Sequence, residues 1–214
     1  MFYDITLPRG NEQEFITMAE KLGIEGLCFL YELLDMKEIE KRKKSTEEIQ
    51  PATKVKLAAA FKTEGIRTYK VHDLGETAIT HAAQNSRETI AKHKPDIVYG
   101  LEQAEEKDYA KSRNSGLDKP TCQFAAKNDV AVAISFSTVL NTERLPQLIG
   151  RIQQNLKLCK KYGIKTAIAS FAKNPYEMRS PHELKSFLLA IGAHTSQAKQ
   201  ATETVSQIIK QHKP

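Results

Sequence analysis

The chain contains 214 residues, and 40% of them are hydrophobic, which suffices for one large core or two small ones. No apolar run reaches the length of a transmembrane helix, so the composition excludes a membrane-spanning helix. The net charge is +6 but uneven, because residues 1–112 carry 17 Lys and Arg against 20 Asp and Glu, whereas residues 113–214 carry 15 against 6. The basic second half favours a polyanionic partner, and nucleic acid is one such class.

The N-terminus and the cysteines indicate a cytoplasmic protein. Residues 1–4 lead directly into a predicted strand, so we expect no signal peptide. Cys28, Cys122 and Cys159 are odd in number, far apart, and without the C-x-x-C spacing of many zinc sites. We therefore expect three reduced, buried thiols of an intracellular protein rather than a disulfide framework.

Apolar runs of strand length recur along the whole chain and predict seven strands. They lie at residues 2–6, 25–30, 55–60, 67–71, 96–99, 131–136 and 166–170. Helical patterns separate most of these runs. Because strands that alternate with helices over short connections form parallel sheets, we expect a mostly parallel sheet.

Three segments between the strands carry helix signals. Residues 11–22 place apolar side chains three and four positions apart, and Gly23 ends that pattern. Residues 144–162 form a longer amphipathic pattern, with Arg151 on its predicted polar face. The charged segment 37–51 is predicted to extend a helix in its first part and to form an exposed loop in its last part.

The strands and helices together favour one domain over residues 1–214. Seven or eight mostly parallel strands with intervening helices predict an α/β fold of the TIM-like (β/α) barrel type. An open, doubly wound sheet that binds a dinucleotide is disfavoured, because no G-x-G-x-x-G sequence follows the first strand.

Barrels of this type place catalytic groups at the carboxyl ends of their strands, so these positions are the first candidates for chemistry. The first strand ends at Thr6 without the His-x-His pair that would bind a divalent ion. The best single candidate is His72-Asp73, which follows the predicted fourth strand. A metal-dependent barrel hydrolase that uses His72 and Asp73 is therefore an alternative function.

Other catalytic motifs are missing from the sequence. It contains no G-x-S-x-G nucleophile elbow and no P-loop. Cys28 and Cys122 lie in apolar surroundings, where a thiol stays protonated and inert. A sugar-phosphate enzyme is a third possibility, but residues 170–177 (SFAKNPYE) lack the glycines of a phosphate-binding loop.

Cationic and amide side chains are frequent at the predicted loops. Arginine binds phosphate oxygens through paired hydrogen bonds, and lysine binds them as a point charge. Such side chains on loops suit contacts with the RNA backbone more than the reading of bases. The candidates for binding RNA or a partner are Arg87, Arg113, Asn114, Lys127, Lys173, Arg179 and Lys199.

Several of these candidates lie in motifs that resemble those of one family. The motifs are RNSGLD at 113–118, AAKNDVAVAISFSTVL at 125–140, NLKLCKKYGIKTAIASFAKNPYEMRSPHEL at 155–184 and QAKQA at 197–201. In this order they are similar to the protein component 3 family of ribonuclease P, known in eukaryotes as the thirty-kilodalton subunit. The resemblance covers roughly residues 85–205, and the short termini resemble those of archaeal members.

The resemblance implies a barrel that is related to metal hydrolases but lacks their metal ligands. It implies a noncatalytic subunit of a ribonucleoprotein that removes the 5′ leader of precursor tRNA. In that particle the RNA and its Mg²⁺ catalyse the reaction, and the protein itself binds no cofactor. The implied partners are the ribonuclease P RNA, protein component 2, other protein subunits and precursor tRNA, with no membrane.

The resemblance also assigns roles to individual residues. By position, the family's polar residues fall on Arg87, Asp96, Arg113, Lys127, Arg179, Glu183 and Lys199. Asp96, Asp118 and Glu183 are expected to support the loops, and the carboxylate of Asp118 to orient Arg113. The loop at 113–118 is expected to hold RNA phosphates or a partner subunit.

Overall fold

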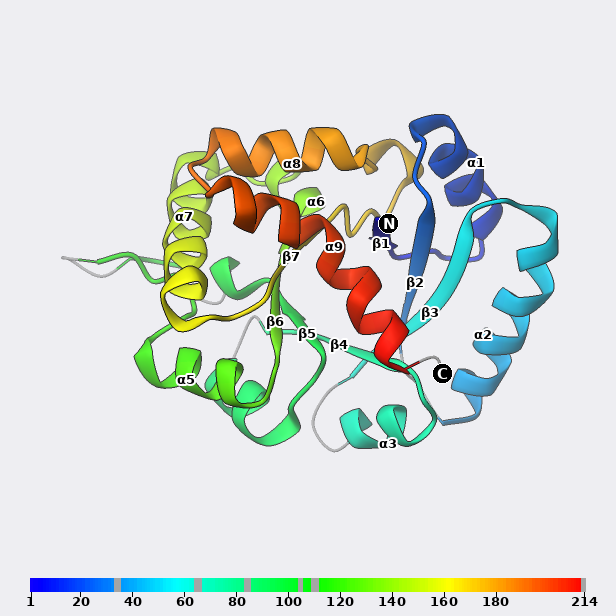
Figure 1. The fold of residues 1–214 in the computed structure, drawn as a ribbon, viewed down its shortest axis with the longest axis horizontal. Helices are drawn as coiled ribbons and strands as arrows, with labels where there is room; N and C mark the ends of the chain where they lie inside the picture. The colour runs from blue at the N-terminus through cyan, green and yellow to red at the C-terminus, as the bar shows by residue number, and fades with distance from the viewer. Residues whose placement is uncertain (33–35, 64–66, 83–85, 104–105, 109–111, 213–214) are drawn as a thin grey trace.

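The computed structural model describes residues 1–32, 36–63, 67–82, 86–103, 106–108 and 112–212 (Figure 1). In these ranges seven strands form one sheet, in which each strand pairs in parallel with the next along the chain. The strands are β1 (Tyr3–Thr6), β2 (Gly26–Glu32), β3 (Lys56–Lys62), β4 (Thr77–His81), β5 (Ile97–Tyr99), β6 (Ala131–Ser135) and β7 (Thr166–Ala169). The predicted TIM-like fold is confirmed as a nearly closed barrel of parallel strands.

A seam between β1 and β7 brings the two edges of the sheet together. Thr6 forms a parallel bridge with Ala172, and the Leu7 N–H donates to the Ala172 carbonyl at 2.8 Å. Earlier on β1, Oδ1 of the buried Asp4 accepts a hydrogen bond from the Ser170 N–H at 2.6 Å. A side chain thus replaces part of the backbone ladder between these strands.

Helix α9 (Thr195–His212) packs over this seam, against β7 and β1. Figure 1 shows it in red, running obliquely across the strands. Its Val205, Ile208 and Ile209 join the core inside the barrel, to which β3, β6 and β7 contribute alanines. Because alanine is small, these strands leave room for the larger side chains of the helix. Thr204 Oγ1 also donates to the carbonyl of Thr166 in β7 at 2.7 Å.

Helices surround the barrel and connect successive strands (Figure 1). They are α1 (Glu12–Leu22), α2 (Met36–Ile49), α3 (Arg67–Asp73), α4 (Ser86–Glu88), α5 (Lys119–Lys127), α6 (Phe136–Leu140), α7 (Leu145–Tyr162), α8 (Pro181–Ala190) and α9, with the short 3-10 helices η1 (Gln50–Ala52), η3 (Leu101–Gln103) and η4 (Pro175–Glu177) and the π-helix η2 (Thr89–His93). Within the described ranges, no helix combines the length and the apolarity that a membrane crossing requires. The helices predicted at 11–22 and 144–162 are confirmed as α1 and α7.

The prediction of a fourth strand at 67–71 is wrong, because these residues belong to helix α3. The strand β4 lies further along and was missed, because its threonines give it a polar appearance. Thr80 is buried nonetheless, since its hydroxyl donates to the Thr63 carbonyl at 2.9 Å. The predicted set of seven strands therefore contained one false strand and missed one true one.

The segment 37–51 also differs from its prediction, since helix α2 continues to Ile49 and only the turn η1 follows it. Ile39 is buried in the core, and Arg42 pairs with Glu38 one turn away at 2.7 Å. The exposed loop expected in the last part of this segment is therefore wrong.

Candidate nucleic-acid interface

The carboxyl ends of the strands surround a cavity of about 420 Å³. Of the residues that the structure describes, three cations line it: Arg9 after β1, Lys62 at the end of β3 and Lys173 after β7. Glu32 at the end of β2 also lines the cavity and pairs with Lys62 at 2.9 Å. Among its described residues this cavity, called the barrel mouth below, therefore has more cations than anions, at the face where such barrels place their binding sites.

Of these cations, Lys173 was among the predicted binding residues, whereas Arg9 and Lys62 were not. Arg9 follows the first predicted strand by a few residues, and Lys62 closely follows the third. Their position after predicted strands was the available signal, because the carboxyl ends of parallel strands meet at one edge of a barrel.

Aromatic side chains and His81 line the same cavity. Phe171 stacks on Tyr99 with ring centroids 4.4 Å apart, and the His81 ring meets the Tyr99 ring edge-on at 4.8 Å. Burial lowers the pKa of His81, and the charges of Lys62 and Lys173 lower it further. The imidazole is therefore neutral near pH 7, so the barrel mouth offers an anion fixed cations and a neutral hydrogen-bonding group.

Glu177 organises the polar groups beside the barrel mouth. Its carboxylate accepts hydrogen bonds from Ser137 Oγ at 3.1 Å, from Asn141 Nδ2 at 3.1 Å and from the Lys173 N–H at 2.9 Å. Burial acts to raise the pKa of Glu177, but these hydrogen bonds outweigh it and hold the pKa below its ordinary value. Glu177 is therefore ionised at neutral pH and fixes the backbone that carries Lys173.

Arg179 and Glu183 shape the turn that follows. Nη1 of Arg179 donates to two carbonyls of its own turn at 2.8 and 3.0 Å, and the guanidinium lies 5.6 Å from the centre of the Phe136 ring. Glu183 caps α8, because its carboxylate accepts from Ser180 Oγ at 2.7 Å and from the Ser180 N–H at 2.9 Å. These bonds lower the pKa of Glu183. Both predicted residues thus have a structural role in this turn.

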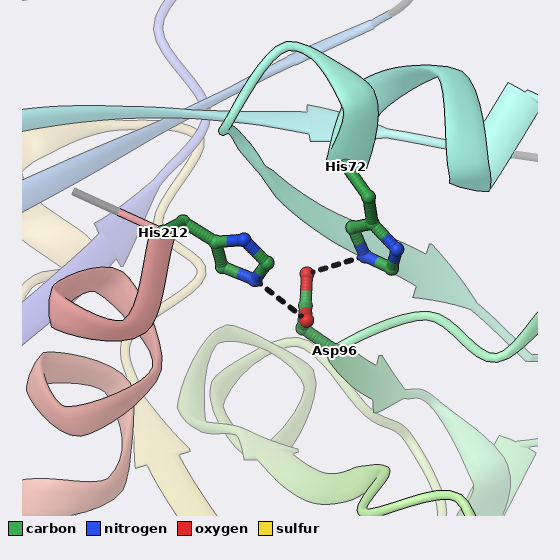
Figure 2. A group of neighbouring side chains, drawn as sticks. All are labelled: His72, Asp96 and His212. Atoms are coloured by element: carbon green, nitrogen blue, oxygen red, sulfur yellow. Dashed lines mark hydrogen bonds and ion pairs between the residues drawn. The ribbon is translucent and has the colours of Figure 1, made fainter. Parts of the chain in front are cut away.

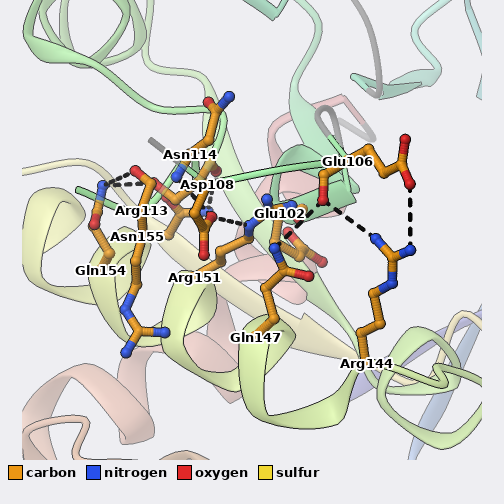
Figure 3. A network of polar contacts seen from close by, with 11 residues as sticks. Glu102, Glu106, Asp108, Arg113, Asn114, Arg144, Gln147, Arg151, Gln154 and Asn155 are labelled. Carbon is orange, nitrogen blue, oxygen red and sulfur yellow. Dashed lines mark hydrogen bonds and ion pairs between the residues drawn. The ribbon is translucent and has the colours of Figure 1, made fainter. Parts of the chain in front are cut away.

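A second group of polar residues fixes the loop before α5 to the surface of α7 (Figure 3). At its centre Arg151, only 3% exposed, donates from Nε to Asp108 Oδ1 at 2.7 Å and from Nη1 to the Glu102 carbonyl at 2.9 Å. The same Asp108 oxygen accepts from the Asn114 N–H at 2.9 Å. The placement of Arg151 on the polar face of the helix was wrong, because this cation is buried under the loop that it binds.

Amide side chains of α7 complete the attachment of this loop. Asn155 Nδ2 donates to the Ser115 carbonyl at 2.9 Å, and Gln154 Nε2 donates to the Arg113 carbonyl at 3.1 Å. Arg151 lies four residues before Asn155, so a polar stripe at helical spacing was the sequence signal for this contact.

The side chain of Arg113 is exposed and extends along α7 (Figure 3). It passes over Gly150, where a Cβ atom would lie 1.3 Å from its Nη1. In the same loop Gly116 has a φ of +79°, and a Cβ there would lie 2.2 Å from the Leu101 carbonyl oxygen. The two glycines therefore permit the close approach of the loop to α7 and to η3.

Arg87 and Asp118 meet at the far end of the loop. They form an ion pair, and Asp118 also begins α5 by accepting from the Thr121 N–H at 2.9 Å. Burial acts to raise the pKa of Asp118, but the bonds from Thr121 and Arg87 hold it below its ordinary value. Among the described contacts this carboxylate binds Arg87, so the prediction that it orients Arg113 is wrong.

The remaining predicted residues lie away from these groups. Lys127 ends α5 where the chain enters β6, at the end of the barrel opposite its mouth, and Lys199 is exposed on α9. His72 and Asp73 end helix α3, and His72 Nε2 bonds Asp96 Oδ2 at 2.9 Å beside the amino ends of β4 and β5. The hydrolase site expected from His72 and Asp73 at a carboxyl strand end is therefore wrong.

A family model described as RNase P subunit p30 matches residues 106–213, just over half of the chain. The chain belongs to the RNase P subunit p30 family. The match begins in the loop that Arg151 holds and continues through the turn after β7 to the end of α9. The family resemblance expected from the motifs is confirmed.

Two archaeal relatives give the extent of this similarity. Ribonuclease P protein component 3 of Methanosarcina mazei is 29% identical over 147 residues, which are 67% of this chain and 55% of the relative. The protein of the same name from Methanocaldococcus jannaschii is 32% identical over 99 residues, which are 45% of this chain and 42% of the relative. The alignments therefore span about half the length of these curated relatives.

Solved structures share the barrel fold with this p30-family chain. A chain in the cryo-EM structure of archaeal ribonuclease P with mature tRNA superposes with a TM-score of 0.76 at 22% identity, covering 97% of this chain and 90% of that one. A prolidase complexed with N-methylphosphonate-L-proline superposes with a TM-score of 0.54 at 10% identity, covering 98% and 74%. At such identities the likeness is one of fold.

Proposed function

We propose that this p30-family protein is a noncatalytic subunit of ribonuclease P that acts in the cytoplasm on precursor tRNA. The observation that carries the proposal is the family match over residues 106–213. The similar fold of a chain in archaeal ribonuclease P with mature tRNA supports it over almost the whole chain.

The cations of the barrel mouth and of the neighbouring loop are the proposed contacts with RNA. Arg9, Lys62 and Lys173 line one cavity, and the exposed Arg113 lies on the loop that α7 holds in place. Fixed cations neutralise closely spaced phosphates and so stabilise a folded RNA. In this proposal the RNA and its Mg²⁺ carry out the cleavage of the 5′ leader, and the protein stabilises the RNA fold.

The proposed protein partners are protein component 2 and the other ribonuclease P subunits. Leu140 and Leu145, at the junction of α6 and α7, are 42% and 44% exposed. Contiguous apolar patches on a surface mark contact with another protein, and we propose that these two leucines belong to such a patch. Arg144 at this junction pairs with Glu106, which lies before Arg113 in the same connection between β5 and α5. In this proposal one partner covers the junction while RNA binds Arg113.

Reconstitution tests the proposed function. Ribonuclease P RNA, component 2 and the other subunits are mixed with and without this protein, and precursor-tRNA cleavage is followed at limiting Mg²⁺. We expect the protein to raise RNA-dependent cleavage and to lower the Mg²⁺ concentration that cleavage requires. The reason is that cationic side chains of the protein take the place of some of the counterions on the RNA.

Two controls make this experiment decisive. The protein without RNA should cleave nothing, and Leu145→Glu should reduce assembly with component 2 while the isolated protein still binds RNA. Cleavage by the protein alone, or no effect of adding it to the other components, would overturn the proposal.

A further inference from the structure

Three potential metal ligands converge at the amino ends of β4 and β5, opposite the barrel mouth (Figure 2). His72 belongs to α3, Asp96 directly precedes β5, and His212 is the last residue of α9. His72 Nε2 lies 2.9 Å from Asp96 Oδ2, and His212 Nε2 lies 2.8 Å from Asp96 Oδ1. Residues 24 and 116 positions from Asp96 thus reach the same carboxylate.

The arrangement of these three side chains suits a single ion. One ligand atom from each residue can be chosen so that all three lie within 4.8 Å of one another. The two imidazole rings lie nearly parallel, with centroids 5.3 Å apart and planes at 15°, on either side of the carboxylate. Ligands bound to one ion at about 2.1 Å lie roughly 3 to 4 Å apart, so small movements of the side chains would suffice.

Neighbouring groups hold the Asp96 carboxylate in place, and a cavity connects the three ligands with solvent. The Ala78 N–H donates to Asp96 Oδ2 at 2.7 Å, which holds the carboxylate as outer hydrogen bonds hold the ligands of known metal sites. A cavity of about 370 Å³, lined by His212, Gly75 and Glu76 among others, adjoins the group. It gives an ion a route from solvent and gives water access to the open coordination positions.

We propose that His72, Asp96 and His212 bind one divalent transition-metal ion of the zinc class. Two imidazole nitrogens and one carboxylate favour such ions over Mg²⁺, which prefers oxygen ligands and keeps most of its water. The ion would join the end of α9 to α3 and to the start of β5. Because α9 covers the barrel seam, the role that follows for the ion is to stabilise the fold.

Metal binding by the isolated full chain, prepared without a histidine tag, tests this site. Co²⁺ is the spectroscopic probe, titrated by visible absorption, and Zn²⁺ is then added in competition. We expect one equivalent of Co²⁺ to bind, Zn²⁺ to displace it, and a large excess of Mg²⁺ to leave it in place. Zn²⁺ should also raise the melting temperature, and a chelator should reverse that rise.

Variants locate the ion. His212→Gln and Asp96→Asn should each weaken Co²⁺ binding at least tenfold and remove the effect of Zn²⁺ on the melting temperature. His182→Gln is the matched control, because His182 is exposed on α8, and it should bind as the parent does. The proposal is overturned if the parent binds no Co²⁺, or if binding survives in both ligand variants.

Discussion

Arg151 of α7 and Arg144, which directly precedes that helix, bind the same loop in different surroundings. Arg151 is buried against Asp108 and the Glu102 carbonyl, whereas Arg144 pairs with Glu106 at 3.2 Å with both side chains mostly exposed. A buried charge has lost its hydration, so its stability depends on its partners in the protein. The attraction within an exposed pair is screened by solvent. The buried arginine should therefore determine the position of the loop.

We expect Arg151→Met to lower the free energy of unfolding by about 2 kcal/mol or more, because the Asp108 carboxylate loses its cation and the Glu102 carbonyl loses the Arg151 donor. Arg144→Met should change it by about 1 kcal/mol at most. Urea unfolding of both variants and the parent measures the difference. Equal losses in the two variants would contradict the distinction between the buried and the exposed cation.

At the scale of elements, α7 works as the platform for the loop at 112–118. The loop is bound through Arg151, Gln154 and Asn155, and Gly150 leaves a space on the helix that the Arg113 guanidinium occupies. The position of Arg113 is therefore set by a residue of another element. A change in α7 can move this cation without removing it.

Gly150→Ala should displace the Arg113 guanidinium, because the added methyl group would overlap it. The flexible side chain can move away, and alanine favours a helix over glycine by about 1 kcal/mol, so the melting temperature should hold or rise. Arg113→Ala should likewise leave the fold intact. We expect both variants to weaken RNA affinity and the activity of the assembled particle, as measured by filter binding and by reconstituted cleavage.

Parental RNA affinity and activity in Arg113→Ala would contradict a role for this cation in binding. If Arg113→Ala weakens RNA binding but Gly150→Ala does not, the position that Gly150 allows the Arg113 guanidinium to take is unimportant for binding. Leu189→Ala, at an exposed position on α8, serves as the surface control and should leave RNA binding unchanged.

The sequence predicted elements better than contacts. The apolar spacing correctly predicted helix α7, but it also predicted a solvent-exposed position for Arg151. A charged side chain is expected on the surface unless its partners in a neighbouring loop are known. Strand β4 was missed because threonine is a polar residue, although the buried Thr80 hydroxyl bonds a backbone carbonyl. The wrong prediction of a strand at 67–71 follows from Thr68, Tyr69 and Val71, which favour strands. The grouping of His72, Asp96 and His212 depends on closure of the barrel, which local patterns do not contain.

At the scale of the whole molecule, two lysines predicted to bind RNA, Lys173 and Lys127, lie at opposite ends of the barrel. Arg9, Lys62 and Lys173 line the barrel mouth, whereas Lys127 lies at the opposite end. If RNA binds at the barrel mouth, Lys173 should contribute to RNA affinity and Lys127 should not. Salt dependence distinguishes them, since each phosphate contact releases counterions.

Lys173→Ala should weaken RNA binding and reduce the slope of log affinity against log salt by about 0.7 to 0.9, the share of one phosphate contact. Lys127→Ala should leave both quantities unchanged. Affinities measured from low to moderate salt with ribonuclease P RNA provide the comparison. An equal effect of the two substitutions would place the RNA elsewhere on the molecule.

The stability of the whole barrel should depend on pH through Asp4. Burial raises its pKa from 3.8 to about 7. Because the folded-state pKa lies above that of the unfolded chain, the contribution of this group is fully present below about pH 4 and is lost as the pH rises through 7. A shift of about three units corresponds to about 4 kcal/mol.

Asp4→Asn should remove the decrease in stability with rising pH that Asp4 causes. A neutral amide has no proton to lose, and its oxygen can still accept a hydrogen bond from the Ser170 N–H. Glu102, whose pKa burial likewise raises to about 7, contributes a separate decline of the same sign that Glu102→Gln should remove. Urea unfolding between pH 4 and 8 measures the slopes. A parental slope in Asp4→Asn would show that Asp4 does not titrate in this interval.

The seam between β1 and β7 has a consequence for how the chain folds. The hydrogen bond between Asp4 and Ser170 spans 166 positions of the chain, and the contact between Asp96 and His212 spans 116. Folding slows as native contacts become more distant in sequence, because the entropy of loop closure is lost before the contacts can form. During synthesis the first strands therefore keep an unpaired edge until α9 has left the ribosome. In that interval the incomplete barrel is most prone to aggregate and most accessible to chaperones.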